Sequence, residues 1–307
     1  MLKARSSGNA TADRRYAYAM DYKTGGDPAS AAELVVQALD EAPGWAAGWL
    51  SLGDLYETLG RLKEAIDAFH RSLSLDPADE AGAGARLARL GEVPPDGAMT
   101  AAHIAALFDE YAPRFERSLV DNLSYRGPAL LRMALEGLGR HGPFERALDL
   151  GCGTGLAGEV FGTLCRDIVG VDLSAAMLAK ARAKQIYRDL ERADIADFLL
   201  RQDADSADLI LAADVFIYLG DLDIVFRQAA RILVPGGLFA FTVQSQDGPA
   251  AFILNHDLRY AHSRAGIANW AAAAGLQLRH LDDAWARTDR GAPVPGMVAV
   301  IERPPIP

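Results

Sequence analysis

Residues 147–158, with the sequence Ala-Leu-Asp-Leu-Gly-Cys-Gly-Thr-Gly-Leu-Ala-Gly, constrain the fold more than any other stretch of the chain. Their order indicates a strand that ends in an acid, followed by a glycine-rich turn and the start of a helix. Glycine adopts positive φ readily and lets a ligand approach the backbone, because it has no Cβ atom. The unpaired N–H groups at the start of the helix face the same place. A ligand site at the carboxyl end of a first strand is typical of doubly wound α/β sheets.

From residue 144 onward, segments with strand and helix patterns alternate. We expect helices at residues 156–164, 175–184, 221–233 and 263–274. The expected strands cover residues 147–150, 167–171, 187–193, 208–212, 238–243, 276–281 and 297–301. Alternation of this kind produces a mainly parallel sheet with helices on both faces. The predicted fold class is therefore α/β, with a Rossmann-like sheet of seven strands.

The first third of the chain contains a short helical repeat. Residues 46–79 carry large, small and proline residues at the offsets of the 34-residue tetratricopeptide pattern, namely Trp49, Leu52, Gly53, Tyr56, Ala65, Phe69 and Pro77. A weaker copy begins 34 residues earlier. We therefore expect an all-α region at 12–91, made of repeats at 12–45 and 46–79 and a capping helix at 80–90. A flexible start at 1–11, a linker at 92–99 and an α/β domain at 100–307 complete the predicted organisation.

Each such repeat buries its apolar face on its neighbours, so two repeats and a cap are marginal alone. The array either packs against the larger domain or another copy of the chain, or it offers a docking surface to a partner protein or peptide. Between the two regions, Phe108, Tyr111, Phe115 and Leu119 recur at helical spacing and share one helical face. That stripe is either ordinary core or, through Tyr111 and Phe115, a lid over a ligand at the glycine turn. A further helix is expected at 129–138.

Composition argues against several classes of partner. The chain of 307 residues has a formal net charge of −10, from 41 acidic residues against 31 Lys and Arg. This excess of negative charge argues against nucleic acid and anionic membrane surfaces as binding partners. The two cysteines form neither a metal-binding pattern nor a disulfide framework, and no metal site is expected. With no secretory signal pattern and no apolar stretch long enough to span a membrane, the sequence predicts a cytoplasmic protein.

Acidic side chains follow the predicted strands at four places, which are Asp149, Asp172, Asp194 and Asp214. Because the carboxyl ends of parallel strands meet at one edge of the sheet, we expect these acids around one ligand. Residues 153–158 also fit the GxGxxG pattern of NAD-binding proteins, and Asp172 suits a ribose in either case. Asp149 would repel a pyrophosphate, however, and would attract a ligand that carries an ammonium and a sulfonium.

These motifs together resemble those of the class I S-adenosylmethionine-dependent methyltransferases. The matching segments are Asp149-Leu-Gly-Cys-Gly-Thr-Gly, Asp172-Leu-Ser-Ala-Ala-Met-Leu, Ala193-Asp194-Ile195, Ala213-Asp214-Val-Phe-Ile-Tyr218, and Pro235-Gly-Gly before the fifth strand. The whole chain is similar to predicted bacterial methyltransferases that carry an N-terminal tetratricopeptide (TPR) region. The resemblance implies S-adenosylmethionine as cofactor, S-adenosylhomocysteine as its product, and cofactor-binding roles for Asp149, Gly151, Gly153, Asp172, Leu173, Met177, Asp194, Ile195 and Asp214.

The resemblance also implies a role for each acid. Asp149 orients the ammonium end of the cofactor, directly or through water, and Asp172 accepts hydrogen bonds from both ribose hydroxyls. Met177 packs on the adenine. Asp194 accepts from the adenine amino group beside the Ile195 N–H, and Asp214 lies near the transferred methyl or the methionine end.

The sequence leaves several alternatives open for the methyl acceptor. Transfer from a sulfonium needs alignment of the acceptor and, where the acceptor is protonated, a general base. The candidate catalytic residues are Tyr111, Tyr218 and His262, with Tyr260 and His256 as further candidates. A small-molecule acceptor is favoured over a protein or a carrier-bound group. Two rival functions are an NAD(P)-dependent oxidoreductase and a non-catalytic adaptor with a ligand-sensing Rossmann-like domain.

Overall fold

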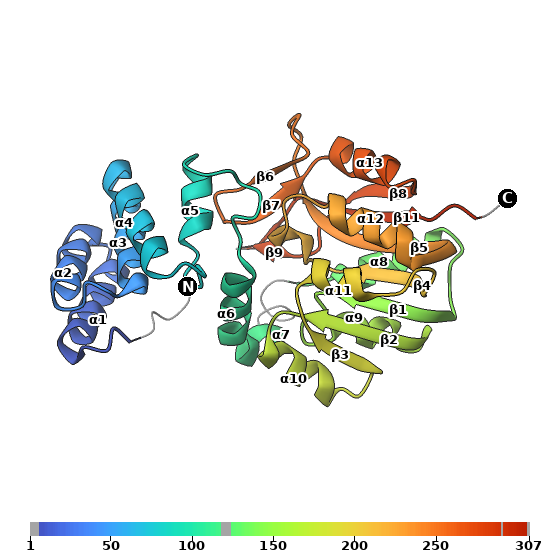
Figure 1. Ribbon diagram of the computed structural model, residues 1–307, viewed down its shortest axis with the longest axis horizontal. Helices are drawn as coiled ribbons and strands as arrows, with labels where there is room; N and C mark the ends of the chain where they lie inside the picture. Colours follow the sequence, from blue (N-terminus) through green and yellow to red (C-terminus); the bar gives the residue numbers. More distant parts are fainter. Residues whose placement is uncertain (1–5, 118–123, 290, 306–307) are drawn as a thin grey trace. The chain divides into compact units, whose positions relative to one another are not determined.

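The computed structural model describes residues 6–117, 124–289 and 291–305 (Figure 1). The chain divides into two compact units, Met1–Leu107 and Phe108–Pro307. The division falls inside helix α6 (Ala101–Tyr111), whereas the sequence predicted that the α/β domain starts at residue 100. Leu119 of the predicted aromatic stripe lies outside the described residues, as does part of the expected flexible start. Asn9 already caps the first helix, because its side chain accepts from Thr11 and Ala12.

The first unit is a stack of helices in the order that the repeat pattern predicted. Helices α1 (Ala10–Thr24) and α2 (Pro28–Glu41) form the first pair, and α3 (Ala46–Thr58) and α4 (Leu62–Leu75) form the second. Gly53 permits the close approach within the second pair, since a Cβ atom there would lie 2.3 Å from the Phe69 ring. Helix α5 (Ala83–Arg89) follows within the predicted cap.

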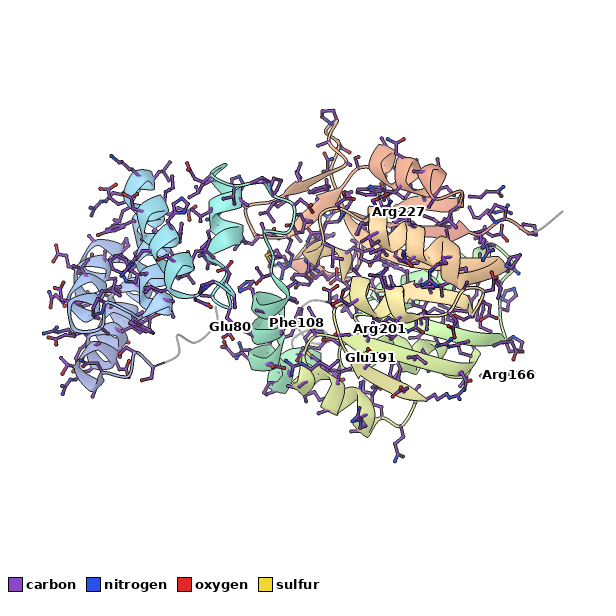
Figure 2. The ribbon with its side chains drawn as sticks, viewed as in Figure 1. Glu80, Phe108, Arg166, Glu191, Arg201 and Arg227 are labelled. Atoms are coloured by element: carbon purple, nitrogen blue, oxygen red, sulfur yellow. The ribbon has the colours of Figure 1, made fainter. Side chains whose placement is uncertain are left out.

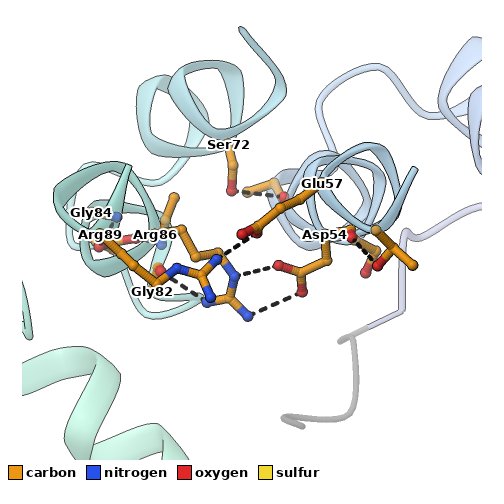
Figure 3. Close-up of polar contacts among 12 residues, drawn as sticks. Asp54, Glu57, Ser72, Gly82, Gly84, Arg86 and Arg89 are labelled. Atoms are coloured by element: carbon orange, nitrogen blue, oxygen red, sulfur yellow. Dashed lines mark hydrogen bonds and ion pairs between the residues drawn. The ribbon is translucent and has the colours of Figure 1, made fainter. Parts of the chain in front are cut away.

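Two ion pairs attach the capping helix to the preceding repeat (Figure 3). Arg86 donates to both oxygens of Asp54, at 2.5 and 3.1 Å, and Arg89 pairs with Glu57. The Arg86 and Asp54 side chains are only 14% and 17% exposed, so water screens this pair weakly. Asp79 caps the N-terminus of α5, because its carboxylate accepts from the Ala83 and Gly84 amides. The cap is therefore fixed by charge and hydrogen bonds as well as by apolar packing.

The second unit is built on a sheet whose main path has the order β3-β2-β1-β4-β5-β11-β8. Strands β1 to β5 run parallel along this path, and β11 is antiparallel to both of its neighbours. These strands are β1 (Phe144–Leu150), β2 (Cys165–Asp172), β3 (Asp189–Arg192), β4 (Ala207–Ala212), β5 (Leu233–Ser245), β8 (Gln277–Ala284) and β11 (Gly296–Glu302). The predicted α/β fold with a seven-stranded, Rossmann-like sheet is confirmed.

A short hairpin extends the sheet beyond the predicted strands. Strand β6 (Phe252–Leu254) pairs with β7 (Tyr260–His262), and β7 pairs in parallel with the end of β5. A separate ribbon joins β9 (Thr288–Asp289) to β10 (Ala292–Pro293). Strand β5 begins at Leu233, so the run Pro235-Gly-Gly, which the sequence analysis placed before the fifth strand, lies inside it.

Helices cover both faces of this sheet (Figure 1). One core contains side chains of α11 (Ile195–Arg201), α12 (Asp223–Ile232) and α13 (Arg264–Ala273). The other contains side chains of α8 (Gly127–Gly137) and α9 (Leu156–Phe161). Helix α10 (Ala175–Ala183) packs on β2 and β3, whereas the short helices η1 (Ala112–Arg114), α7 (Phe115–Arg117) and η3 (Phe216–Tyr218) lie in connections.

Charged side chains surround these cores at the surface (Figure 2). Arg201 pairs with Glu191, and Arg227 pairs with Asp223 one helical turn away. Arg166 is 69% exposed. Such exposed pairs contribute little to stability, so the fold rests mainly on the two apolar layers.

Candidate active site

The glycine turn after β1 requires glycine at three positions. Gly151, Gly153 and Gly155 have φ values of 64°, 55° and 91°, which L-residues rarely adopt. A Cβ atom at Gly151 would lie 2.3 Å from Cγ2 of Val215, so the segment after β4 packs directly on the turn. At Gly153 the nearest described atom to such a Cβ, on the Phe115 ring, is 3.8 Å away. The turn therefore has one tightly packed glycine and one with space beside it.

Asp172, at the end of β2, joins the glycine turn to the loop before α10. Its Oδ2 accepts from the Gly153 amide at 2.9 Å, and its Oδ1 accepts from the Ser174 amide at 2.8 Å. Burial raises the pKa of this carboxyl, while the two amides act in the opposite direction. Each carboxylate oxygen can accept more than one hydrogen bond, so both can still accept from a ligand.

Asp149 lies buried beneath the turn, with 1% of its surface exposed. Its Oδ2 accepts a 2.6 Å hydrogen bond from the Tyr187 hydroxyl, which in turn accepts from the Gly158 amide at 3.1 Å. Burial raises the pKa of Asp149 to about 7, against the lowering effect of the Tyr187 bond. Sequence analysis missed Tyr187, because it placed this residue in a predicted strand where an aromatic side chain is ordinary.

The predicted adenine-binding residues lie at the starts of two helices. Asp194 caps α11 by accepting from the Ala196 amide at 2.8 Å, and Ile195 begins that helix as a buried residue. Met177 is buried in the first turn of α10. Leu173 follows Asp172, and its carbonyl accepts from Arg192 at 3.0 Å. One oxygen of Asp194 thus caps the helix, and the other oxygen remains for the proposed contact with adenine.

Asp214, after β4, forms a buried ion pair with Arg287. The Arg287 Nη1 to Asp214 Oδ2 distance is 2.5 Å, and the side chains are 7% and 16% exposed. Asp214 has a φ of 57°, and its amide donates to Thr242 Oγ1 at 2.8 Å. Burial raises its pKa, while Arg287 and then Arg259 oppose that shift. Sequence analysis missed Arg287, which belongs to no motif and comes from the loop after β8.

Three members of the predicted aromatic stripe gather beside the turn. Phe115 lies next to Gly153 and makes edge-on contacts with Phe108 and Tyr111, at centroid distances of 6.0 and 5.6 Å. Phe108 contacts Tyr218 in the same way at 5.3 Å. Two of the candidate catalytic residues, Tyr111 and Tyr218, therefore belong to one aromatic cluster next to the glycine turn.

Polar contacts fix the stripe to helix α10. Asp109 accepts from the Ser174 hydroxyl at 2.5 Å and from the Ala176 amide at 3.1 Å. Lys184 pairs with Glu116 at 2.8 Å. Because Ser174 also bonds to Asp172, the stripe and the acid loop are held by the same residue. Nothing in the sequence pattern singled out Asp109, since its partner lies far along the chain.

His262, the third candidate, is fully buried at the end of β7. Its Nε2 lies 3.1 and 3.0 Å from the carbonyl oxygens of Leu219 and Gly220, and burial lowers its pKa to about 4. The ring is therefore neutral, and Nε2–H donates to these carbonyls. The geometry shows a residue that positions the segment after η3. Of the further candidates, Tyr260 is buried and His256 is exposed.

Within the described ranges, no three His, Cys, Asp or Glu side chains form a group that could hold a metal ion. In the same ranges, none of the helices has both the length and the apolarity needed to cross a membrane. Cys152 and Cys165 are free thiols, and burial raises the pKa of both.

Comparison with protein families finds one match in each of the two units. A family model described as a methyltransferase domain matches residues 148–241. The chain carries a methyltransferase domain. The match runs from β1 into β5, so it contains the glycine turn and all four aspartates of the site. A tetratricopeptide repeat model matches residues 46–79, which confirms the second predicted repeat.

Curated relatives resemble part of the methyltransferase domain. The chain is 37% identical over 101 residues to a ubiquinone biosynthesis O-methyltransferase of Chelativorans sp. (strain BNC1), covering 31% of this chain and 40% of the relative. It is 38% identical over 106 residues to a malonyl-[acyl-carrier protein] O-methyltransferase of Legionella pneumophila, covering 34% and 37%. The chain thus spans less than half the length of each of these two relatives.

Two solved structures also align with part of the chain. An S-adenosylmethionine-dependent methyltransferase from Mesorhizobium loti is 23% identical and has a TM-score of 0.46, with 57% of this chain and 96% of that chain covered. The N-methyltransferase NodS from Bradyrhizobium japonicum, in complex with S-adenosylhomocysteine, is 21% identical with a TM-score of 0.45, covering 58% and 86%.

Proposed function

We propose that the methyltransferase domain binds S-adenosylmethionine at the glycine turn and transfers its methyl group to a small-molecule acceptor. The arrangement of Asp172 carries this proposal. The carboxylate is held by the Gly153 and Ser174 amides in a fixed orientation, with acceptor capacity left for two ribose hydroxyls. The space beside Gly153, where a Cβ would have no neighbour among the described residues closer than 3.8 Å, fits a ligand that passes close to the backbone.

The other predicted cofactor-binding residues take roles consistent with this placement. Asp149, anchored by Tyr187, supplies negative charge beneath the turn for the ammonium end. Asp194 and the Ile195 amide are assigned to the adenine edge, with Met177 against its face. Gly151 keeps the turn in its shape, because Val215 fills the space where a side chain would lie. Asp214 lies at the edge of the site, and the ion pair with Arg287 already neutralises its charge.

S-adenosylmethionine, when bound, supplies a methyl group that is already activated for in-line displacement. The residues of this chain then have to align the acceptor and exclude water. We assign the exclusion of water to the aromatic cluster that includes Tyr111 and Tyr218. His262 has its Nε2–H committed to two carbonyls, so any proton that it takes must go to Nδ1. Its lowered pKa makes it a weak base, and this favours a positioning role for His262.

For the tetratricopeptide region we propose association with a protein, either a partner or a second copy of the chain. Exposed aromatic side chains on α1 support this proposal. Tyr18 and Tyr22 are 57% and 49% exposed. Aromatic residues are enriched at the centres of protein interfaces, where their large apolar surface is buried.

Calorimetric titration with S-adenosylhomocysteine tests the proposed function. The parent protein should bind it, and Asp172→Ala should bind roughly ten- to a hundredfold more weakly, because the ribose hydroxyls lose a charged acceptor. Asp167→Ala is the matched control, since Asp167 lies on the same strand but pairs with Arg188 at the surface. Binding of NADH without binding of S-adenosylhomocysteine would overturn the proposal in favour of an oxidoreductase.

A further inference from the structure

Two buried hydrogen-bond donors near the ends of β5 and β7 lack a partner among the described residues. They are Nε2 of Gln244 and Nε of Arg259. Buried donors are nearly always satisfied in folded proteins, because an unpaired one costs the free energy of its lost hydration. Two such donors in one neighbourhood therefore call for an acceptor that the chain itself does not provide.

The strand register places both donors on the same side of the sheet. Gln244 pairs with Ala261 across β5 and β7. Arg259 precedes Ala261 by two residues, and side chains two residues apart point to the same face of an extended chain. The Nδ1 of His262 is also buried without a partner in the part of the chain that the structure describes. His262 is one residue from Ala261, so its side chain points to the other face of the sheet. The Gln244 and Arg259 side chains thus lie on one face of the sheet, and the His262 side chain lies on the other.

This pair borders the candidate active site. Thr242, two residues before Gln244 on β5, accepts from the Asp214 amide at 2.8 Å. Arg259 hydrogen-bonds Tyr218, a member of the aromatic cluster beside the glycine turn. Gln244 Oε1 accepts from Asn255 at 3.5 Å, which leaves its Nε2 free to donate elsewhere. The two donors therefore lie where an acceptor molecule would extend away from the methyl donor.

The charges at this place favour an anion. Arg287 is already neutralised by Asp214 in a buried ion pair. Arg259 makes a longer ion-pair contact, of 3.4 Å, with Asp257, whose side chain is 45% exposed. The Arg259 side chain is 34% exposed although its Nε is buried, so part of this side chain is open to solvent. A planar guanidinium with N–H groups to spare matches the two oxygens of a carboxylate.

We propose that Arg259 and Gln244 bind a carboxylate group of the methyl acceptor, so that the acceptor is an organic acid. This inference rests on the proposed methyltransferase function and specifies its substrate class. Arg259 supplies the charge, and the Gln244 amide donates to an oxygen of the same carboxylate. The aromatic cluster next to Arg259 adds a preference for acids with a flat, apolar body.

Matched acid and amide pairs test the proposal in the presence of saturating S-adenosylhomocysteine. The probes are benzoate and benzamide, 4-hydroxybenzoate and 4-hydroxybenzamide, and hexanoate and hexanamide, with dissociation constants measured by calorimetry. In the full-length parent protein, at least one acid should bind tenfold or more tightly than its amide, because the amide lacks the charge that Arg259 recognises. Acids that bind no better than their amides, or no binding by any acid, would overturn the inference.

Variants assign the effect to the two donors. Arg259→Gln and Gln244→Met should each reduce the acid-to-amide preference at least threefold, and Arg259→Lys should retain part of it because the charge remains. Arg264→Gln is the control, since Arg264 pairs with Asp283 at the surface. Cooperative thermal unfolding and S-adenosylhomocysteine titration of every variant confirm that the domain is folded. A preference that survives both Arg259→Gln and Gln244→Met would also overturn the inference.

The two proposals fail in different ways. If the parent protein does not bind S-adenosylhomocysteine, the proposed function fails. If it binds S-adenosylhomocysteine but does not prefer acids through Arg259 and Gln244, only the acceptor class is wrong.

Discussion

The Tyr187 hydroxyl donates a 2.6 Å hydrogen bond to Asp149 and accepts one of 3.1 Å from the Gly158 amide. One side chain thereby joins the first acid of the site to the helix that follows the glycine turn. Tyr187 also fills the space beside Gly158, where a Cβ atom would lie 2.7 Å from the ring. The ionisation of Asp149 is consequently coupled to the packing beneath the turn.

Binding of S-adenosylhomocysteine should weaken as the pH falls below about 7. Burial raises the pKa of Asp149 to about 7, so below this value the free protein must lose a proton before Asp149 can attract the ligand's ammonium. Affinity should therefore fall by up to roughly tenfold per pH unit between pH 7 and pH 5. Calorimetry at pH 8, 7 and 6 measures this dependence, and an affinity that stays constant over this range contradicts it.

Tyr187→Phe should move that pH dependence upward. The variant removes the hydrogen bond that stabilises the ionised Asp149, so half-maximal binding should occur at a higher pH than in the parent protein. Tyr22→Phe serves as the control, because Tyr22 is exposed on α1. Identical pH profiles for Tyr187→Phe and the parent would show that the hydroxyl does not tune Asp149.

Alanine substitutions in the glycine turn should differ in cost. Gly153→Ala should lower the free energy of unfolding by about 1–2 kcal/mol, because alanine resists the left-handed backbone while space for its Cβ exists. Gly151→Ala should cost at least about 1 kcal/mol more, since its Cβ would overlap Val215. Urea denaturation measures both.

A glycine outside the turn provides the control for this pair. Gly137 ends α8 without a positive φ, and a Cβ there would meet no atom of the described residues within 4 Å. Gly137→Ala should therefore be neutral or should stabilise the domain by about 0.5–1 kcal/mol. Equal losses in Gly151→Ala and Gly153→Ala would mean that contact with Val215 does not matter.

His262 should destabilise the domain in acid. Its pKa is about 4 in the folded chain, against 6.5 for the ordinary residue, so the unfolded chain binds the extra proton first. The contribution of neutral His262 is present above pH 6.5 and is lost as the pH falls toward 4, by about 3 kcal/mol in total. His262→Gln, which keeps a donor for the Leu219 and Gly220 carbonyls, should remove this part of the acid sensitivity.

Denaturation curves from pH 7 to pH 4 compare His262→Gln with the parent protein. His256→Gln is the control for the same substitution at an exposed histidine. If the parent and His262→Gln lose stability in parallel as the pH falls, the burial of a neutral His262 is not the cause.

The ion pair between Arg86 and Asp54 should stabilise the capping helix measurably. A double-mutant cycle with Arg86→Ala and Asp54→Ala should give a coupling free energy of about 1–2 kcal/mol, since the pair is bidentate and mostly buried. The exposed pair Arg15–Glu41, with side chains 34% and 43% exposed, should give less than about 0.5 kcal/mol. Similar coupling for both pairs would rule out a special role for the cap contact.

Local patterns in the sequence predicted those parts of the fold that depend on neighbouring residues. Most of the seven strands along the main path of the sheet follow from short apolar runs, several of which are separated by predicted helices. The helix pairs of the repeats follow from residues such as Gly53 and Phe69, whose spacing reflects close packing within one unit. Helix α11 was missed because its seven residues, Ile195–Arg201, are too few to show a helical period. The β6–β7 hairpin was missed because each strand has only three residues.

In the candidate site, the sequence indicates which positions the backbone restricts but does not reveal long-range partners. The glycines and Asp172 were identified because their positions follow directly from a strand and a turn. Arg287 and Tyr187 could not be identified in this way, since each meets its aspartate only after distant segments fold together. His262 was chosen for its chemistry, and only its burial and its carbonyl partners indicate that it positions a loop.

The place of β11 in the sheet has a consequence for biosynthesis. Residues 296–302 form the last described strand to leave the ribosome, yet they lie between β5 and β8. Until they emerge, most of β5 has an unpaired edge and β8 has no neighbouring strand. The parallel part of the sheet therefore keeps an unpaired edge strand during this time. The helical repeats involve only short sequence separations and can fold well before that moment. Translation thus separates the two units in time, and a pause before residue 296 would prolong the interval in which the open edge can aggregate.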